Sequence, residues 1–472
     1  MSLNTKPPTC FELAYNRDSS RLMRRLSLLE MPAFLDSSAY QGDSARYDIL
    51  SAAPAANIKI ESGHVIVSDP EFSVSSNTGI ELDKLLSIIR QLKAKYLASA
   101  DQHQALGVGL PFQGGIIGYL GYPELLGAST FNINEAFVGI YLWAVVVDHQ
   151  QCSCRLVFHP VCSDSDRAQI HTLLHSDNTD SPASPYSASY SSPEPAFTLK
   201  SSFKNHLSRD EYRNAFNQIK QYIDAGDCYQ VNLTQSFRAE CSGNPLDAYL
   251  SLRNATQAPF SAYMNWQSGA LLSLSPERFL SLRDNTVLTQ PIKGTRPRSE
   301  DSNTDAQLAS ALVESEKDRA ENLMIVDLLR NDLGRVCKTG SVKANQLFAL
   351  QSFSNVHHMV SSISGELAQG LGAFELLASC FPGGSITGAP KLRAMEIIEQ
   401  LEQASRRAYC GSVFYLSANG NMDSSITIRT LLWQQDHILC WAGGGIVADS
   451  ECDAEYDECF DKINIIIKTL QK

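Results

Sequence analysis

A serine- and proline-rich stretch from His175 to Ser202 most constrains how this chain can fold, because it interrupts the apolar patterns on both sides of it. Such a composition buries too little apolar surface to pack as a core. We therefore expect an N-terminal region over residues 1–175, a linker or surface loop over 176–203, and a C-terminal region over 204–472. The total of 472 residues is enough for two or three domains.

The N-terminal region has the local patterns of mixed strands and helices. Ile58–Val67 alternates around a Ser62-Gly63 turn, which predicts a hairpin. Leu82–Leu97 has apolar residues at helical spacing. Phe137–Val147 is the longest apolar run; it is too short to span a bilayer and is rich in strand-forming residues.

The C-terminal region begins with a helix signal. Ser208 and Glu211 form a capping-box pattern, the apolar positions that follow have helical spacing, and Gly226 closes the helix. Strands are predicted at Tyr229–Phe237, Ser261–Trp266, Ala270–Leu274 and Thr286–Gln290.

Charge and cysteine content narrow the class of protein. The net charge of −12 argues against a nucleic-acid binder, so an anionic substrate would need a local cationic site or a metal ion. The twelve cysteines contain no CxxC pair, which argues against zinc and against a disulfide scaffold. The N-terminus lacks the apolar core of a signal peptide, so we expect a soluble cytoplasmic protein without a membrane segment.

Lys293 lies in the octapeptide Pro291–Arg298, between a strand-like segment and a Gly-Thr corner. Neighbouring cations and burial both favour the neutral, nucleophilic form of a lysine. A second candidate, Glu277, follows the predicted strand Ala270–Leu274. A strand, a turn and a further strand can bring it into one pocket with Lys293. The alternatives are a basic turn at a strand end and a surface glutamate.

Two predicted helices each carry an acidic pair at i,i+3 spacing. Asp318 and Glu321 form one pair, and Glu455 and Glu458 form the other. Carboxylate oxygens are the ligands that Mg²⁺ prefers, and it usually takes only one or two of them. Solvated acidic faces are the common alternative.

The glycine-rich segment Phe381–Lys391 does not fit a phosphate loop, because Ala389 stands where the loop lysine belongs. It either presents a ligand carboxylate to a helix N-terminus or packs tightly. Ala442–Gly445 similarly leaves bare backbone N–H groups beside a cavity. His358 and Ser361 are polar candidates within a site, or a core histidine with a polar neighbour.

Together these segments resemble the chorismate-utilising enzymes, the family that includes anthranilate, isochorismate and aminodeoxychorismate synthases. The resemblance is dense from about Ser208 onward and looser before it. It rests on Ser275–Phe279, Pro291–Arg298, Ala320–Gly334, Phe381–Lys391, Ile426–Thr430, Ala442–Asp449 and Ala454–Lys462.

Within the family, anthranilate synthases usually carry alanine where this chain has Lys293. Lysine there resembles the para-aminobenzoate branch that leads to folate, as do Gly226–Asn232 and Ala454–Glu458. The resemblance implies an α+β fold, a four-layer α/β/β/α sandwich of two facing mixed sheets with outer helices. Both regions of the chain are expected to contribute to both sheets.

The resemblance also implies an activity, namely amination of chorismate by ammonia to 4-amino-4-deoxychorismate. It implies Mg²⁺ as cofactor and a separate glutamine amidotransferase subunit as the source of ammonia. Lys293 is expected to be the nucleophile, Glu277 the proton donor and His358 a histidine of the catalytic site. The implied substrate-binding residues are Gly294, Thr295, Tyr409, Arg429, Gly443 and Gly445. The implied magnesium ligands are Glu321 and Glu458, with Glu455 and Asp318 at outer positions.

Relatives also carry an N-terminal pocket that can hold tryptophan. Its lining resembles Ser37, Ser44, Ala45, Arg46, Tyr47, Pro259, Phe260 and Ser261. These residues are equally compatible with a structural role, because tryptophan is not the product of this branch. Two other functions stay open, component I of an anthranilate synthase and a non-catalytic metabolite-binding subunit.

Overall fold

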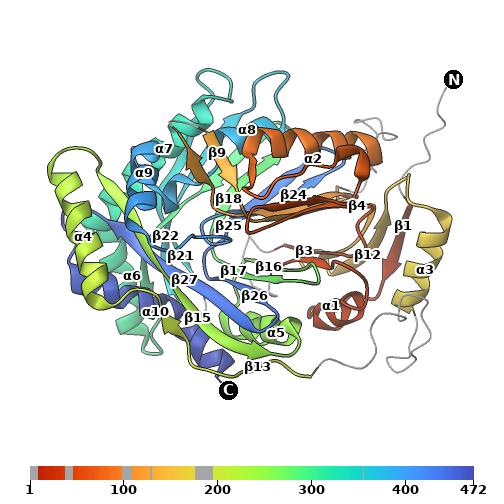
Figure 1. Ribbon diagram of the computed structural model, residues 1–472, viewed down its shortest axis with the longest axis horizontal. Coiled ribbons are helices and arrows are strands. Elements are labelled where there is room, and N and C mark those ends of the chain that lie inside the picture. The colour runs from red at the N-terminus through yellow and green to blue at the C-terminus, as the bar shows by residue number, and fades with distance from the viewer. Residues whose placement is uncertain are drawn as a thin grey trace.

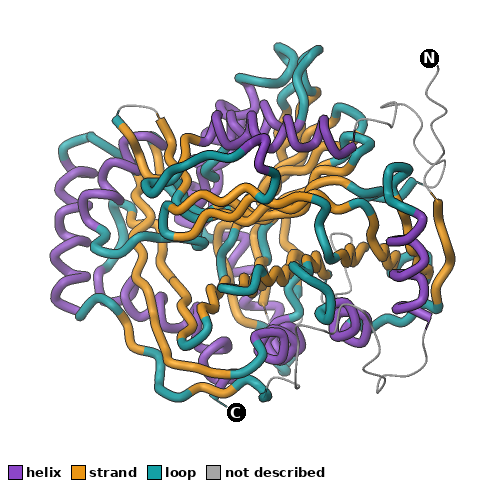
Figure 2. The backbone as a smooth tube through the Cα atoms, turned by 45° about the vertical axis from the view of Figure 1, so that its right-hand side comes forward, coloured by secondary structure: helices purple, strands orange, loops and turns teal. Residues whose placement is uncertain are grey.

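Two large sheets stacked face to face form the centre of the molecule (Figure 2). The computed structural model describes residues 9–37, 46–97, 109–127, 130–175, 195–353 and 356–471. All strand pairings among these residues are antiparallel, so the two facing sheets are as expected but antiparallel rather than mixed. Strands that are neighbours in the sheet orders given below are the ones that pair.

The first sheet has 13 strands within the described part of the chain. Their spatial order is β1 (Thr9–Leu13), β12 (Ser153–Phe158), β11 (Trp143–Asp148), β3 (Tyr47–Ser51), β2 (Ala33–Asp36), β16 (Phe260–Asn265), β17 (Ala270–Ser275), β26 (Thr430–Gln434), β27 (His437–Ile446), β15 (Gln230–Ser242) and β13 (Thr198–Leu199), with β14 (Lys204–Asn205) and β23 (Gly388–Ala389) also paired to β15.

The second sheet has 11 strands within the same residues. Their order is β20 (Ile292–Pro297), β22 (Val356–Glu366), β19 (Thr286–Gln290), β18 (Arg278–Arg283), β25 (Met422–Ile426), β24 (Ser412–Ser417), β7 (Gly115–Leu120), β10 (Ala136–Tyr141), β4 (Ala56–Glu61) and β5 (His64–Val67), with β21 (Lys343–Ser352) paired to β22. A small third sheet contains β6 (Ile80–Glu81), β9 (Thr130–Ile133) and β8 (Glu124–Leu126).

Helices cover the outer faces of both sheets, which gives the expected four layers. In Figure 1, α2 and α8 lie above the sheets and α1 and α5 lie below them. The helices are α1 (Ser20–Leu26), α2 (Leu82–Leu97), α3 (Asp164–His175), α4 (Arg209–Asp224), α5 (Pro245–Thr256), α6 (Ser302–Glu314), α7 (Glu316–Gly334), α8 (Ala373–Cys380), α9 (Lys391–Leu401) and α10 (Cys452–Leu470), with short 3-10 turns η1 (Pro70–Phe72) and η3 (Gly384–Ile386).

Two apolar clusters hold the layers together. One packs α2, the second sheet and the inner face of the first sheet, and the other packs α1, α4, α5 and α10 against the outer face of the first sheet. Strands β7, β10 and β11 are buried along their whole length. Burial on both faces explains why these strands are apolar along nearly their whole length, except at Asp148, rather than alternating.

Most local predictions are confirmed. The hairpin over Ile58–Val67 is β4 and β5, and the helix over Leu82–Leu97 is α2. The capping box of Ser208 and Glu211 is present at the start of α4. Both sheets contain strands from either side of the serine- and proline-rich segment. Within that segment Thr198–Leu199 forms β13, and residues 176–194 lie outside the described residues.

Candidate active site

Lys293 and Glu277 lie at the same end of one hairpin. Strands β18 and β19 pair Arg278 with Gln290, so the residue before β18 and the residues after β19 are neighbours. A third residue joins the two: Ser385 of η3 donates its hydroxyl to Glu277 Oε1 at 2.7 Å. The backbone carbonyl of Ser385 accepts a hydrogen bond from Lys293 Nζ at 3.1 Å. The expected strand, turn and strand therefore bring acid and amine together.

Both side chains are shifted towards their neutral forms. Burial raises the pKa of Glu277 to about 7, although the Ser385 hydroxyl and the positive charge of Lys293 oppose this. Burial lowers the pKa of Lys293, although Glu321 and Glu277 oppose this. A protonated carboxyl can donate a proton to a leaving group, and an unprotonated amine can attack carbon.

His358 faces Thr295 across strands β22 and β20. Its Nδ1 lies 2.8 Å from Thr295 Oγ1. Burial and the nearby Arg429 lower the pKa of His358 to about 3, so the ring is neutral. Its Nε2 is buried and has no hydrogen-bond partner among the described residues. A ligand that bonds to this nitrogen would offset an otherwise unfavourable burial.

Arg429 lies in the turn between β25 and β26 with φ +50°, a conformation that non-glycine residues rarely adopt. Within the described residues its guanidinium makes no ion pair. Burial lowers its pKa, opposed by Tyr409. Tyr409 is buried and stacks on Trp441, with ring centroids 6.3 Å apart. An unpaired, enclosed cation suits a carboxylate ligand.

The glycines of β27 are required by its close approach to β15. A methyl group on Gly443 would lie 2.2 Å from the carbonyl oxygen of Leu233, and one on Gly445 would lie 2.2 Å from Gln230 Nε2. Gln230 is fully buried, and neither atom of its amide has a partner in the described part of the chain. Gly294 has φ +80°, and a methyl group there would lie 3.0 Å from Asp318 Cγ.

One acid of each pair on α7 and α10, Glu321 and Glu458, acts on Lys293 at longer range. Burial raises the pKa of Glu321, and Glu455 adds to this by repulsion; burial also raises the pKa of Glu455. Glu458 pairs with Lys462 at 2.7 Å, and Asp318 pairs with Arg296 at 2.8 Å. Across the described ranges no three acidic, histidine or cysteine side chains form a metal-binding cluster.

These acids nonetheless fit Mg²⁺ in type and number. Carboxylate oxygens are its preferred ligands, and one or two suffice when water and substrate oxygens complete the shell. Burial is the main cause of the raised pKa values of Glu321 and Glu455, and repulsion from neighbouring acids adds to it; a bound cation would stabilise the charged carboxylates against both.

Ser385 and Gln230 are the site residues that the sequence prediction missed. Ser385 lies in the segment Phe381–Lys391, whose sequence signals are its glycines and the helix that follows them. The lysine of that segment, Lys391, pairs with Asp332 at 2.5 Å and therefore anchors the loop rather than a ligand. The available sequence signal was a hydroxyl within a glycine-rich run. Only the fold shows that this hydroxyl lies beside Glu277 and Lys293.

A second site lies between the sheets at the N-terminal end. A cavity of about 890 Å³ is lined by Arg46, Tyr47, Pro259, Phe260 and Ser261 among other residues. Ser37 is buried beside it, and Ser44 and Ala45 lie outside the described residues. Arg278 also lines the cavity, with its guanidinium over the Phe260 ring.

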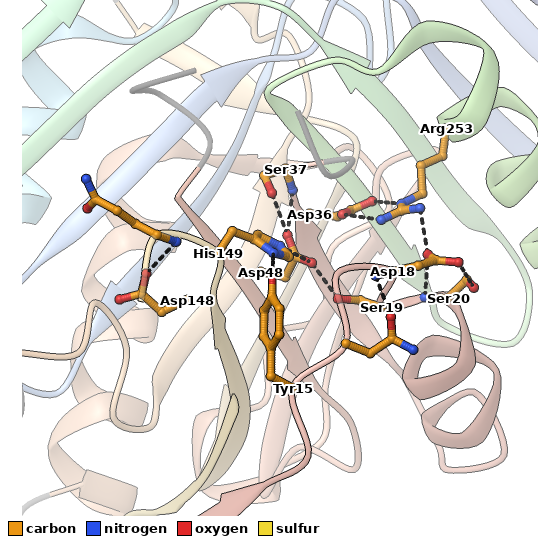
Figure 3. Close-up of polar contacts among 12 residues, drawn as sticks. Tyr15, Asp18, Ser19, Ser20, Asp36, Ser37, Asp48, Asp148, His149 and Arg253 are labelled. Carbon is orange, nitrogen blue, oxygen red and sulfur yellow. Dashed lines mark hydrogen bonds and ion pairs between the residues drawn. The ribbon is translucent and has the colours of Figure 1, made fainter. Parts of the chain in front are cut away.

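Asp48 contacts His149, a residue that lines this cavity, and Figure 3 shows the polar contacts around it. It accepts the hydroxyls of Ser19 at 2.5 Å and Ser37 at 2.7 Å, and lies 2.9 Å from His149 Nε2. Burial opposes the charge, but the contacts with His149 and Ser19 outweigh it and lower the pKa of Asp48. Nearby, Asp36 pairs with Arg253 at 2.5 Å.

Residues 36–468 match the family model of the chorismate binding enzymes. The chain is 42% identical over its full length to aminodeoxychorismate synthase component 1 of Escherichia coli K12, of which it covers 100%. It is 32% identical to anthranilate synthase component 1 of Pseudomonas putida over 93% of this chain and 90% of that one. The crystal structure of anthranilate synthase component I from Streptococcus pneumoniae TIGR4 superposes with a TM-score of 0.70, at 29% identity over 90% of this chain and 93% of that one.

Proposed function

Because this chain belongs to the chorismate binding enzymes and is a chorismate-utilising enzyme, we propose that it aminates chorismate at C4 to give 4-amino-4-deoxychorismate. The observation that supports this most is that Ser385 hydrogen-bonds to both Lys293 and Glu277. Burial shifts the pKa of this amine and this acid towards their neutral forms. The name of the full-length Escherichia coli relative supports the same reaction.

The reaction uses both members of this pair. The lone pair of Lys293 Nζ adds to C2 of the ring, the two ring double bonds shift, and the C4–O bond breaks. Glu277 gives its proton to the departing hydroxyl, which leaves as water, and then takes the extra proton from the new secondary ammonium. Ammonia adds at C4, the double bonds shift back, and Lys293 leaves with a proton returned by Glu277. The new ammonium at C4 then gives a proton to Glu277, which restores the acid. The net reaction converts chorismate and ammonia into product and water.

The remaining groups position the dianionic substrate. Arg429, Thr295 and Tyr409 are proposed to hold one carboxylate and the ring, and the backbone of Gly294, Gly443 and Gly445 permits close approach. His358 contacts the substrate through its free Nε2. Glu321 and Glu458 would hold Mg²⁺, with Glu455 and Asp318 farther out, and the ion would neutralise charge on the other carboxylate. Positioning of this kind can supply much of the rate acceleration.

Two partners follow from this function. The relative's name as component 1 supports a second component, which we propose is a glutamine amidotransferase that supplies ammonia. The product would enter para-aminobenzoate and folate synthesis after a separate lyase releases pyruvate.

No helix among the described residues is long and apolar enough to cross a membrane.

The cavity between the sheets is proposed to hold tryptophan. Its Phe260 and Tyr47 offer aromatic faces, and Arg46, which pairs with Asp148 but stays partly exposed, offers a cation that suits an amino acid's carboxylate.

The first test is a product assay with chorismate, Mg²⁺ and ammonium at mildly alkaline pH. Aminodeoxychorismate, trapped as para-aminobenzoate by added lyase, is the expected product, and EDTA should abolish its formation. Fluorescent anthranilate would instead assign the chain to the activity named for its Pseudomonas putida relative. Neither product, even with a glutaminase present, would indicate a non-catalytic binding subunit.

A further inference from the structure

Ser385 contacts both reactive groups of the site at once. Its hydroxyl donates to Glu277 Oε1 at 2.7 Å and its carbonyl accepts from Lys293 Nζ at 3.1 Å. The residue is 9% exposed, and the acid it contacts is 5% exposed. Lys293 of β20 and Glu277, the residue before β18, are therefore bridged by one residue of η3, which lies about 90 to 110 positions later in the chain.

The loop that carries Ser385 is fixed from several sides. Asn232 Nδ2 and Arg406 Nη1 both donate to the carbonyl of Ile386 at 3.0 Å. Thr387 Oγ1 donates back to the carbonyl of Gly383 at 3.1 Å. Arg406 is itself buried and paired with Glu402 at 2.7 Å. Ser385 is thus held by contacts that do not depend on Glu277 or Lys293.

The direction of these hydrogen bonds has a chemical consequence. The Ser385 hydroxyl donates to Glu277 Oε1, and the backbone N–H of Ile292 also contacts this carboxyl. With Oε1 engaged as an acceptor, the proton of the neutral acid is favoured on Oε2, which is then the oxygen that donates to substrate. The Ser385 carbonyl takes one N–H of neutral Lys293 and so restricts the direction of its lone pair. We propose that Ser385 is a positioning residue that fixes the donor oxygen of Glu277 and the attack direction of Lys293. This inference rests on the proposed function.

The test compares Ser385→Ala with Thr387→Ala in the ammonium-dependent assay. Thr387 is the matched control, a buried hydroxyl of the same loop that bonds only within it. Ser385→Ala should lower kcat roughly 10- to 100-fold with little change in KM, because the lost contact orients reacting groups rather than binding substrate. Ser385→Thr, which keeps the hydroxyl, should recover most of the loss.

A pH profile separates positioning from loop packing. The Ser385 hydroxyl opposes the burial that raises the pKa of Glu277, so its removal should move the high-pH loss of activity to higher pH. The titratable groups that bear on Glu277 are Lys293 and the buried Cys410, and both are unchanged in this variant. Thr387→Ala should leave the profile in place.

Three results would overturn the inference. They are a Ser385→Ala variant with wild-type kcat, an equal loss in Thr387→Ala, and a further loss when Ser385→Ala is added to Glu277→Gln. A wild-type chain that forms no aminated product is a different outcome, because it would refute the proposed function itself.

Discussion

Burial acts on the two reactive side chains in complementary ways. It raises the pKa of Glu277 to about 7 and lowers the pKa of Lys293, so it favours the neutral form of each. Each group also stabilises the charged form of the other, so the pair is balanced between two neutral groups and an ion pair. The site can therefore present acid and nucleophile together at a pH where isolated side chains would both be ionised.

Replacement of Lys293 by alanine should lower the rate of amination on the order of 100-fold or more, because the covalent step loses its nucleophile. The assay is formation of para-aminobenzoate with excess lyase and ammonium. Lys338→Ala, which removes an exposed lysine paired only with Glu366, is the control. Amination at the wild-type rate in Lys293→Ala would remove the covalent step from the mechanism.

Glu277→Gln should lower activity by roughly 100-fold or more yet stabilise the fold at neutral pH. The folded pKa of about 7 lies above the ordinary value of 4.5, so the wild-type protein loses stability as pH rises between these values and stays lower above them. The variant lacks this loss, and its advantage should grow to about 1–3 kcal/mol by pH 7.5.

Chemical denaturation of both proteins at pH 5 and pH 7.5 measures this difference. Glu81→Gln, at an exposed position, should show no such pH dependence. A constant difference for Glu277→Gln would mean that the buried carboxyl is not protonated in the fold.

At the scale of elements, long strands set the position of the site. Strand β15 pairs with β27 from Val231 to Glu240, and the two run close enough to exclude a side chain at Gly443. Strand β22 brings His358 opposite Thr295, and the hairpin of β18 and β19 returns the chain to Glu277. Backbone pairing, rather than loop geometry, therefore fixes most of these contacts.

Gly443→Ala should destabilise the protein by about 2–4 kcal/mol, because the added methyl group meets backbone that cannot move aside. Gly334→Ala, at the end of α7 with no atom within 4 Å of the added carbon, should be neutral or slightly stabilising. The free energy of unfolding of the two variants gives the comparison, and equal values would contradict the close strand approach.

Sequence patterns predicted those elements whose signal is local. The helix α2 and the hairpin of β4 and β5 follow from periodicity within a few residues, and the capping box of α4 from two side chains. The bridging role of Ser385 could not be predicted, since it depends on residues about 90 and 110 positions earlier in the chain. The buried, unpaired amide of Gln230 could not be predicted either, because the amide lies against Gly445, more than 200 residues later in the chain.

At the scale of the molecule, neither region can complete a sheet alone. Strand β2 pairs with β16, and β7 pairs with β24, so each sheet crosses the serine- and proline-rich segment. The cavity between the sheets likewise combines Arg46 and Tyr47 with Phe260 and Arg278. The division at residues 176–203 is therefore a boundary in sequence only, because both regions of the chain contribute strands to each of the two large sheets.

A chain cut after Ser184 should therefore recover activity only when both pieces are made together. Each piece alone would expose unpaired strand edges and should aggregate. Co-expression followed by size-exclusion chromatography and the product assay measures the outcome. A soluble, folded piece made by itself would contradict the shared sheets.

The same sharing governs how the protein is synthesised. Strand β7 cannot complete its pairing until β24 is made, because Leu120 pairs with Ser412, which leaves the ribosome about 290 residues later. At typical translation rates that delay is roughly 15 to 60 s. During this time the apolar strand β7 is paired with β10 on one side only, so its other edge stays unfilled in the nascent chain until β24 arrives, and we expect this edge to need shielding from aggregation.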